Sequence, residues 1–127
     1  MMEQLIAHLI GDYFLQSDWQ ALNKTKKFWI ACVHGTLYVV PFYWFFHLSM
    51  AAHVTIVSSH ILIDHYGLAR YVVWLHNWIG LKRPAPWASC QMTGFGDDRP
   101  IWLTVWLTII VDNTMHLTIN YLALRYL

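Results

Sequence analysis

The feature that most constrains this chain is a histidine and an aspartate four residues apart, present in three apolar segments. The pairs are His8 with Asp12, His60 with Asp64 and, in reversed order, Asp112 with His116. Residues four apart share one face of a helix, with about 6 Å between their Cβ atoms. Two side chains placed in this way can bind one metal ion or can hydrogen-bond to each other. Any fold of this chain must therefore accommodate three polar pairs in apolar surroundings.

The composition favours a membrane as those surroundings. The chain of 127 residues is 57% hydrophobic and only 12% charged, whereas soluble domains carry roughly 25% charged residues. A soluble domain of this size would expose large apolar patches and aggregate. We therefore expect one integral membrane domain that spans residues 1–127. The net charge of +1 gives no reason to expect nucleic acid as a partner.

The apolar segments predict an all-α fold, namely an integral membrane bundle of four transmembrane helices. The expected spans cover about residues 4–19, 28–48, 51–70 and 101–124. The first is short, because a span normally needs about 20 residues. Pro41 interrupts the second, so we expect a kink there. Residues 71–79 either extend the third helix or lie in the membrane interface.

Basic residues predict the orientation of this bundle. They concentrate in two connecting loops, residues 20–27 and 80–100, as Lys24, Lys26, Lys27, Lys82, Arg83 and Arg99. Cytoplasmic loops carry an excess of lysine and arginine. A multi-pass protein with both loops in the cytoplasm and both termini outside satisfies that rule.

An estimate of depth indicates that the polar residues converge. At 1.5 Å per residue, Asp12, His34 and Asp64 lie about 10 Å from the cytoplasmic ends of their segments, and Asp112 lies about 16 Å in. Each aspartate inside a span costs about 2.5–3.5 kcal/mol. A shared divalent cation would compensate their charge.

We therefore predict one intramembrane His/Asp cluster that binds a divalent metal. The expected ligands are His8, Asp12, His60, Asp64, Asp112 and His116. His34 and Asp12 are the expected catalytic residues. Histidine and aspartate together suit zinc best, and also iron or manganese. Two other interpretations stay open: the pairs lock the bundle by hydrogen bonding, or they form a path for protons or ions.

The opening segment also resembles a known family. His8-Leu9-Ile10-Gly11-Asp12-Tyr13-Phe14-Leu15-Gln16 is similar to the opening motif of small membrane proteins of bacteria and their phages called domain of unknown function 3307. Lys24, His34 and the two later His/Asp pairs follow in the order typical of that family. The resemblance covers nearly the whole chain. It implies the bacterial inner membrane as the location, but it supplies no reaction.

Two functions are consistent with these observations. The first is a membrane-embedded metal-dependent hydrolase that acts on a lipid or phosphoester at the cytoplasmic leaflet. The second is a non-catalytic membrane effector that perturbs the envelope, excludes superinfecting phage or forms a pore, with the His/Asp cluster structural or ion-conducting. Membrane lipids are the expected partners in both cases, and a homo-oligomer is an open alternative to a monomer. The sequence does not decide whether the chain is an enzyme.

Overall fold

The computed structural model describes residues 2–80 and 85–127, and every regular element within them is helical. The all-α prediction is therefore confirmed for the part of the chain that is described. The chain divides into two compact units, Met1–Tyr66 with His116–Leu127, and Gly67–Met115.

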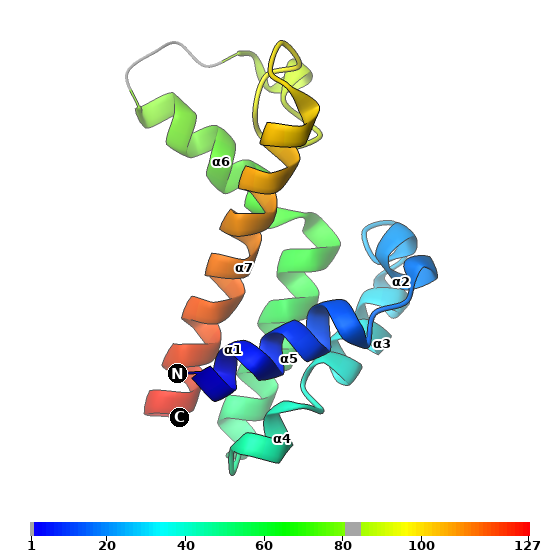
Figure 1. Cartoon of the computed structure of the whole chain (residues 1–127), viewed down its shortest axis with the longest axis vertical. Helices are drawn as coiled ribbons and strands as arrows, with labels where there is room; N and C mark the ends of the chain where they lie inside the picture. The colour runs from blue at the N-terminus through cyan, green and yellow to red at the C-terminus, as the bar shows by residue number, and fades with distance from the viewer. Residues whose placement is uncertain (1, 81–84) are drawn as a thin grey trace. The chain divides into compact units, whose positions relative to one another are not determined.

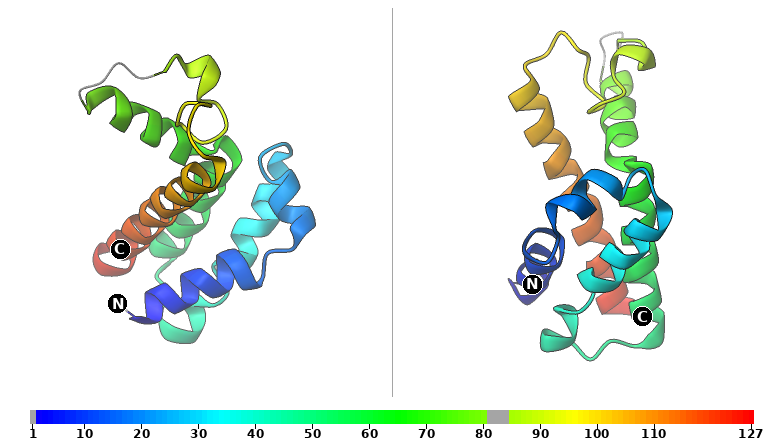
Figure 2. Two further views of the ribbon diagram at one scale, coloured as in Figure 1. Left: turned by 45° about the horizontal axis from the view of Figure 1, so that its top comes forward. Right: turned by 90° about the vertical axis from the view of Figure 1, so that its right-hand side faces the viewer.

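The first unit is built from short helices around one long one. Its elements are α1 (Met2–Leu9), the π-helical turn η1 (Ile10–Phe14), α2 (Asp18–Asn23), α3 (Phe28–Tyr38), α4 (Phe42–Phe45), α5 (Met50–Tyr66) and the last residues of α7 (Ile101–Tyr126). Figures 1 and 2 show α3 packed along α5, with η1 against α3 and α1 against α4. Small and aromatic side chains fill the core of this unit: Ala7, Tyr38, Val39, Phe42, Ala52, Ile56 and Ala123.

The expected helix over residues 4–19 is divided into three pieces. After η1 the chain leaves the helix, and Ser17 starts α2 by accepting a hydrogen bond from the Gln20 backbone N–H. The Gln20 side chain accepts in return from the Ser17 backbone N–H, which completes a capping box. Part of the loop expected over residues 20–27 is therefore helical. The interruption expected at Pro41 is present, because α3 ends at Tyr38 and α4 begins at Phe42.

The second unit contains α6 (Leu68–Ile79), the 3-10 turn η2 (Trp87–Ser89) and the first part of α7. Gly67 separates α5 from α6 with a φ of 58°, a left-handed conformation that glycine adopts without steric cost. The helix expected over residues 51–70 therefore ends at Tyr66, and residues 71–79 belong to a helix of their own. The prediction over residues 101–124 corresponds to α7. The expected basic residues Lys82 and Arg83 lie outside the described residues.

One helical segment within residues 2–80 and 85–127, Phe28–Phe45, is long and apolar enough to cross a membrane by length and composition. Core helices of soluble proteins pass the same test. The four-span bundle and its orientation therefore stay predictions.

Candidate metal centre

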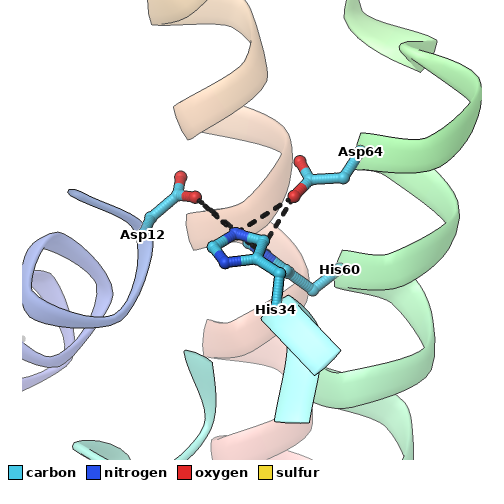
Figure 3. A group of neighbouring side chains, drawn as sticks. All are labelled: Asp12, His34, His60 and Asp64. Carbon is cyan, nitrogen blue, oxygen red and sulfur yellow. Dashed lines mark hydrogen bonds and ion pairs between the residues drawn. The ribbon is translucent and has the colours of Figure 1, made fainter. Parts of the chain in front are cut away.

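Four side chains from three elements of the first unit converge on one point. Asp12 comes from η1, His34 from α3, and His60 and Asp64 from successive turns of α5, as Figure 3 shows. Each offers one ligand atom, and these atoms all lie within 4.8 Å of one another. All four residues are buried, with at most 5% of their surface exposed. The convergence expected from the spacing in the sequence thus occurs for these four residues.

The facing atoms are Asp12 Oδ1, His34 Nε2, His60 Nε2 and Asp64 Oδ2. His34 Nε2 lies 3.2 Å from Asp12 Oδ1, 3.3 Å from Asp64 Oδ2 and 3.0 Å from His60 Nε2. His60 Nε2 lies 3.1 Å from Asp64 Oδ2 and 3.7 Å from Asp12 Oδ1. Every one of the four atoms therefore has a potential donor or acceptor close by.

These separations fit a small divalent cation. A tetrahedral ion with bonds of about 2.0–2.2 Å holds its ligand atoms roughly 3.3–3.6 Å apart. The separations that involve a histidine nitrogen run from 3.0 to 3.7 Å, and the two carboxylate oxygens lie within 4.8 Å of each other. Two imidazole nitrogens and two carboxylate oxygens form a donor set typical of zinc. The buried His/Asp group could therefore hold a metal ion.

Lys24 approaches the same atoms from the side of α2. Its Nζ lies 2.7 Å from Asp64 Oδ2, 3.8 Å from Asp12 Oδ1 and 3.4 Å from His34 Nε2. The Lys24 side chain is 15% exposed, against 1–5% for the four converging side chains. With neutral histidines the two carboxylates and this ammonium leave the cluster one negative charge. A divalent ion would reverse that sign.

Local structure positions both Lys24 and Asp12 at the centre. His65 lies with its Nδ1 2.9 Å from the carbonyl oxygen of Lys24 and so holds the chain after α2. At the other end, η1 places Asp12 on a π turn, a feature that is frequent at functional sites. Gly11 lets this turn approach α3 closely, because a Cβ there would lie 2.5 Å from the Tyr38 carbonyl oxygen.

A second layer of buried polar side chains surrounds the four. His116 Nδ1 lies 3.2 Å from His60 Nδ1, and His116 Nε2 lies 3.4 Å from Asp64 Oδ1. The Tyr38 ring stacks on the His60 ring at 3.6 Å and 11°. The Tyr38 hydroxyl lies 2.8 Å from His8 Nδ1 and accepts a hydrogen bond of 2.6 Å from Asn120 Nδ2. His8 Nε2 in turn lies 4.0 Å from Asp12 Oδ2. The outer nitrogen of His60 is hydrogen-bonded in this layer, and the outer oxygens of Asp12 and Asp64 face its two histidines.

The structure thus divides the predicted site residues into groups. Asp12, His34, His60 and Asp64 share one centre, and His8 and His116 lie around it. Asp112 is half-buried on α7, one turn before His116, and belongs to the second unit. The roles of all these residues as ligands or catalysts stay predictions.

Sequence reasoning missed three buried or partly buried members of the network. Tyr38 and Asn120 were not singled out, and Lys24 was considered only for membrane orientation and as part of the family resemblance. The four-residue spacing contains the signal for two of them, because Tyr38 follows His34 by four residues and Asn120 follows His116 by four. No spacing rule predicts Lys24, which reaches the centre from the C-terminal end of α2.

The fold and the site together define an all-helical protein with a buried histidine and aspartate centre able to hold a divalent ion. The family model described as protein of unknown function (DUF3307) matches residues 1–83, and the chain belongs to this family. The matched region contains Lys24 and all four converging residues. No curated protein and no solved structure matches the chain.

Proposed function

We propose that the protein is a membrane-embedded metal-dependent hydrolase of anionic esters, with a lipid or another phosphoester as its substrate. The observation that carries this proposal is the convergence of two carboxylate oxygens and two imidazole nitrogens, all within 4.8 Å of one another. A divalent ion held there would lower the pKa of a bound water toward about 7 and so supply a nucleophile at neutral pH.

A catalytic ion needs an open position. Zinc enzymes hold the metal with three protein ligands and leave the fourth position to water, whereas structural sites use four protein ligands. Three of the four side chains would therefore hold a catalytic ion, and the fourth would be free to act on the bound water. His34 is the least restrained, because its Nδ1 is buried without a hydrogen-bond partner within the described residues. His60 Nδ1, by contrast, contacts His116. In our proposal Asp12, His60 and Asp64 would hold the ion, and His34 would accept a proton from the bound water.

Charge supports an anionic substrate. With neutral histidines the cluster carries one negative charge, Lys24 included, and a divalent ion would change this to one positive charge. Lys24 is the most exposed member of the cluster, so its ammonium is placed to contact a phosphoester oxygen at the edge of the centre. Membrane lipids supply such esters at the cytoplasmic leaflet, where we expect Lys24 to lie.

A matched set of variants tests the proposal. The protein is purified in detergent without chelators, its metal content is measured, and hydrolysis of a chromogenic phosphodiester is followed. We expect about one ion per chain, loss of both ion and hydrolysis in Asp64→Asn, and retention of the ion with loss of hydrolysis in His34→Ala. His53→Gln is the control, because this histidine lies on the same helix as His60 and pairs with Tyr43. A wild-type protein that contains no transition metal would overturn the proposal.

One observation favours a second candidate, the non-catalytic membrane effector. The Lys24 ammonium already neutralises part of the buried charge, 2.7 Å from Asp64 Oδ2, so the cluster can lock the helices without any ion. This alternative predicts that His34→Ala leaves the biological effect of the protein unchanged at equal abundance. The hydrolase predicts loss of that effect.

A further inference from the structure

The hydrogen bonds around the centre determine which histidines are able to bind an ion. A neutral imidazole carries one hydrogen, on Nδ1 or on Nε2. A ring that binds a cation through Nε2 must therefore carry its hydrogen on Nδ1. His60 turns Nε2 to the centre, so its Nδ1–H is directed at His116 Nδ1, 3.2 Å away. His116 is the acceptor in this contact.

That assignment fixes the second nitrogen of His116. Because its Nδ1 accepts, the hydrogen of the neutral ring is on Nε2, which lies 3.4 Å from Asp64 Oδ1. The Nε2–H group faces this outer carboxylate oxygen and has no lone pair for a metal. His60 and His116 cannot both bind an ion through Nε2 while the contact between their Nδ1 atoms persists.

The same reasoning applies on the other side of the centre. Asn120 Nδ2 donates to the Tyr38 hydroxyl oxygen, so the hydroxyl hydrogen is directed at its other neighbour, His8 Nδ1. His8 then carries its hydrogen on Nε2, which faces the outer oxygen of Asp12, Oδ2, at 4.0 Å. Both histidines therefore present an N–H group to the oxygen of an aspartate that points away from the centre.

We infer that His8 and His116 are positioning residues rather than metal ligands, and that each restricts one aspartate to a single oxygen bond with the ion. This inference rests on the proposed metal centre. It predicts that the centre binds zinc-like ions in preference to Ca²⁺, because Ca²⁺ takes six to eight oxygen ligands and often binds both oxygens of a carboxylate. A centre with two single oxygen donors and imidazole nitrogen disfavours Ca²⁺ and favours zinc-like ions.

Nuclear magnetic resonance tests the assignment directly. The full chain, with isotope-labelled histidine, is loaded in detergent with NMR-active cadmium, and nitrogen–cadmium couplings are assigned. We expect coupling to His60, with or without His34, and Nε2-protonated neutral rings for His8 and His116. Coupling of cadmium to His8 or His116 would leave the metal centre intact and overturn their positioning role. A protein that binds no cadmium would instead refute the metal centre itself.

Variants of His116 provide a second measurement. Replacing groups that orient a ligand typically weakens metal binding about 10–100-fold, and we expect this from His116→Ala with the number of coupled histidines unchanged. His116→Gln keeps an amide N–H near the position of Nε2, so it should bind the ion more tightly than His116→Ala. If the alanine variant does not fold, the glutamine variant is compared with the unmodified protein instead. His53→Gln should leave the affinity unchanged. Loss of one coupled histidine, or no loss of affinity in His116→Ala, would overturn the inference.

Discussion

Lys24 contacts the same two carboxylates that would hold a divalent ion. The ammonium lies 2.7 Å from Asp64 Oδ2 and 3.8 Å from Asp12 Oδ1, so it lowers the negative potential that attracts a cation. We expect Lys24→Gln to bind zinc roughly tenfold more tightly, about 1.4 kcal/mol, and to bind inorganic phosphate more weakly once zinc is present. Competition titration with a zinc chelator and phosphate titration of the zinc-loaded protein measure the two effects.

Lys26→Gln is the matched control, because Lys26 lies two residues further on and is exposed. It removes the same charge from the protein without touching the centre, so neither affinity should change. Weaker zinc binding in Lys24→Gln would contradict the prediction. It would indicate that Lys24 is needed to fold the centre rather than to balance its charge.

At the scale of single residues, the sequence predicted the centre well where one helix carries both partners. Helical periodicity alone places His60 and Asp64 on one face, and the structure keeps them 3.1 Å apart. Periodicity does not show which neighbouring helix supplies the opposing group. The contacts of Lys24 with Asp64 and of His116 with His60 join residues 40 and 56 positions apart, and such pairs depend on tertiary packing.

At the scale of elements, glycine determines how closely the helices that carry the centre approach. A Cβ at Gly11 would lie 2.5 Å from the backbone oxygen of Tyr38, and a Cβ at Gly35 would lie 2.5 Å from the Ile61 side chain. We expect Gly11→Ala to lower the free energy of unfolding by about 1–3 kcal/mol, and Gly35→Ala to cost less. The reason is that the Cβ at Gly35 would meet a half-buried side chain, which can shift toward the surface, whereas the Cβ at Gly11 would meet backbone.

Denaturant unfolding of both variants in detergent measures which of them loses more free energy of unfolding. Gly11→Ala should also weaken zinc binding, because Gly11 precedes Asp12. An equal or smaller destabilisation by Gly11→Ala than by Gly35→Ala would contradict the close approach of η1 to α3.

The boundaries of the elements were predicted less well than their existence. Residues 4–19 have one apolar period, yet the backbone passes through a π turn before Ser17 starts a new helix. A π turn adds one residue to a helical turn and leaves the apolar pattern almost unchanged. Gly67 similarly ends α5 inside an apolar run. A pattern of hydrophobic residues does not record either change of backbone direction.

At the scale of the whole molecule, many large apolar side chains are exposed. In the second unit one face of α6 presents Tyr71, Val72, Leu75, Trp78 and Ile79, each at least 42% exposed. Positions spaced in this way form a single stripe on a helix. A soluble protein rarely leaves such a stripe uncovered, and aromatic residues are typical of a membrane interface. The apolar composition and this exposed stripe both favour a membrane location. Several helices are nevertheless shorter than the about 20 residues of a typical span.

We therefore expect the protein to remain with the membrane through an alkaline carbonate wash and to require detergent for release, because burial of apolar side chains does not depend on charge. Triple replacement of Leu75, Trp78 and Ile79 by serine should weaken retention if α6 contacts lipid. The control is replacement of Ser58, Thr36 and Thr114, which are polar and exposed, by alanine. Fractionation followed by immunoblotting measures the retained share. Release of the unmodified protein by carbonate alone would refute membrane insertion, and with it the lipid substrate, but would leave the metal centre standing.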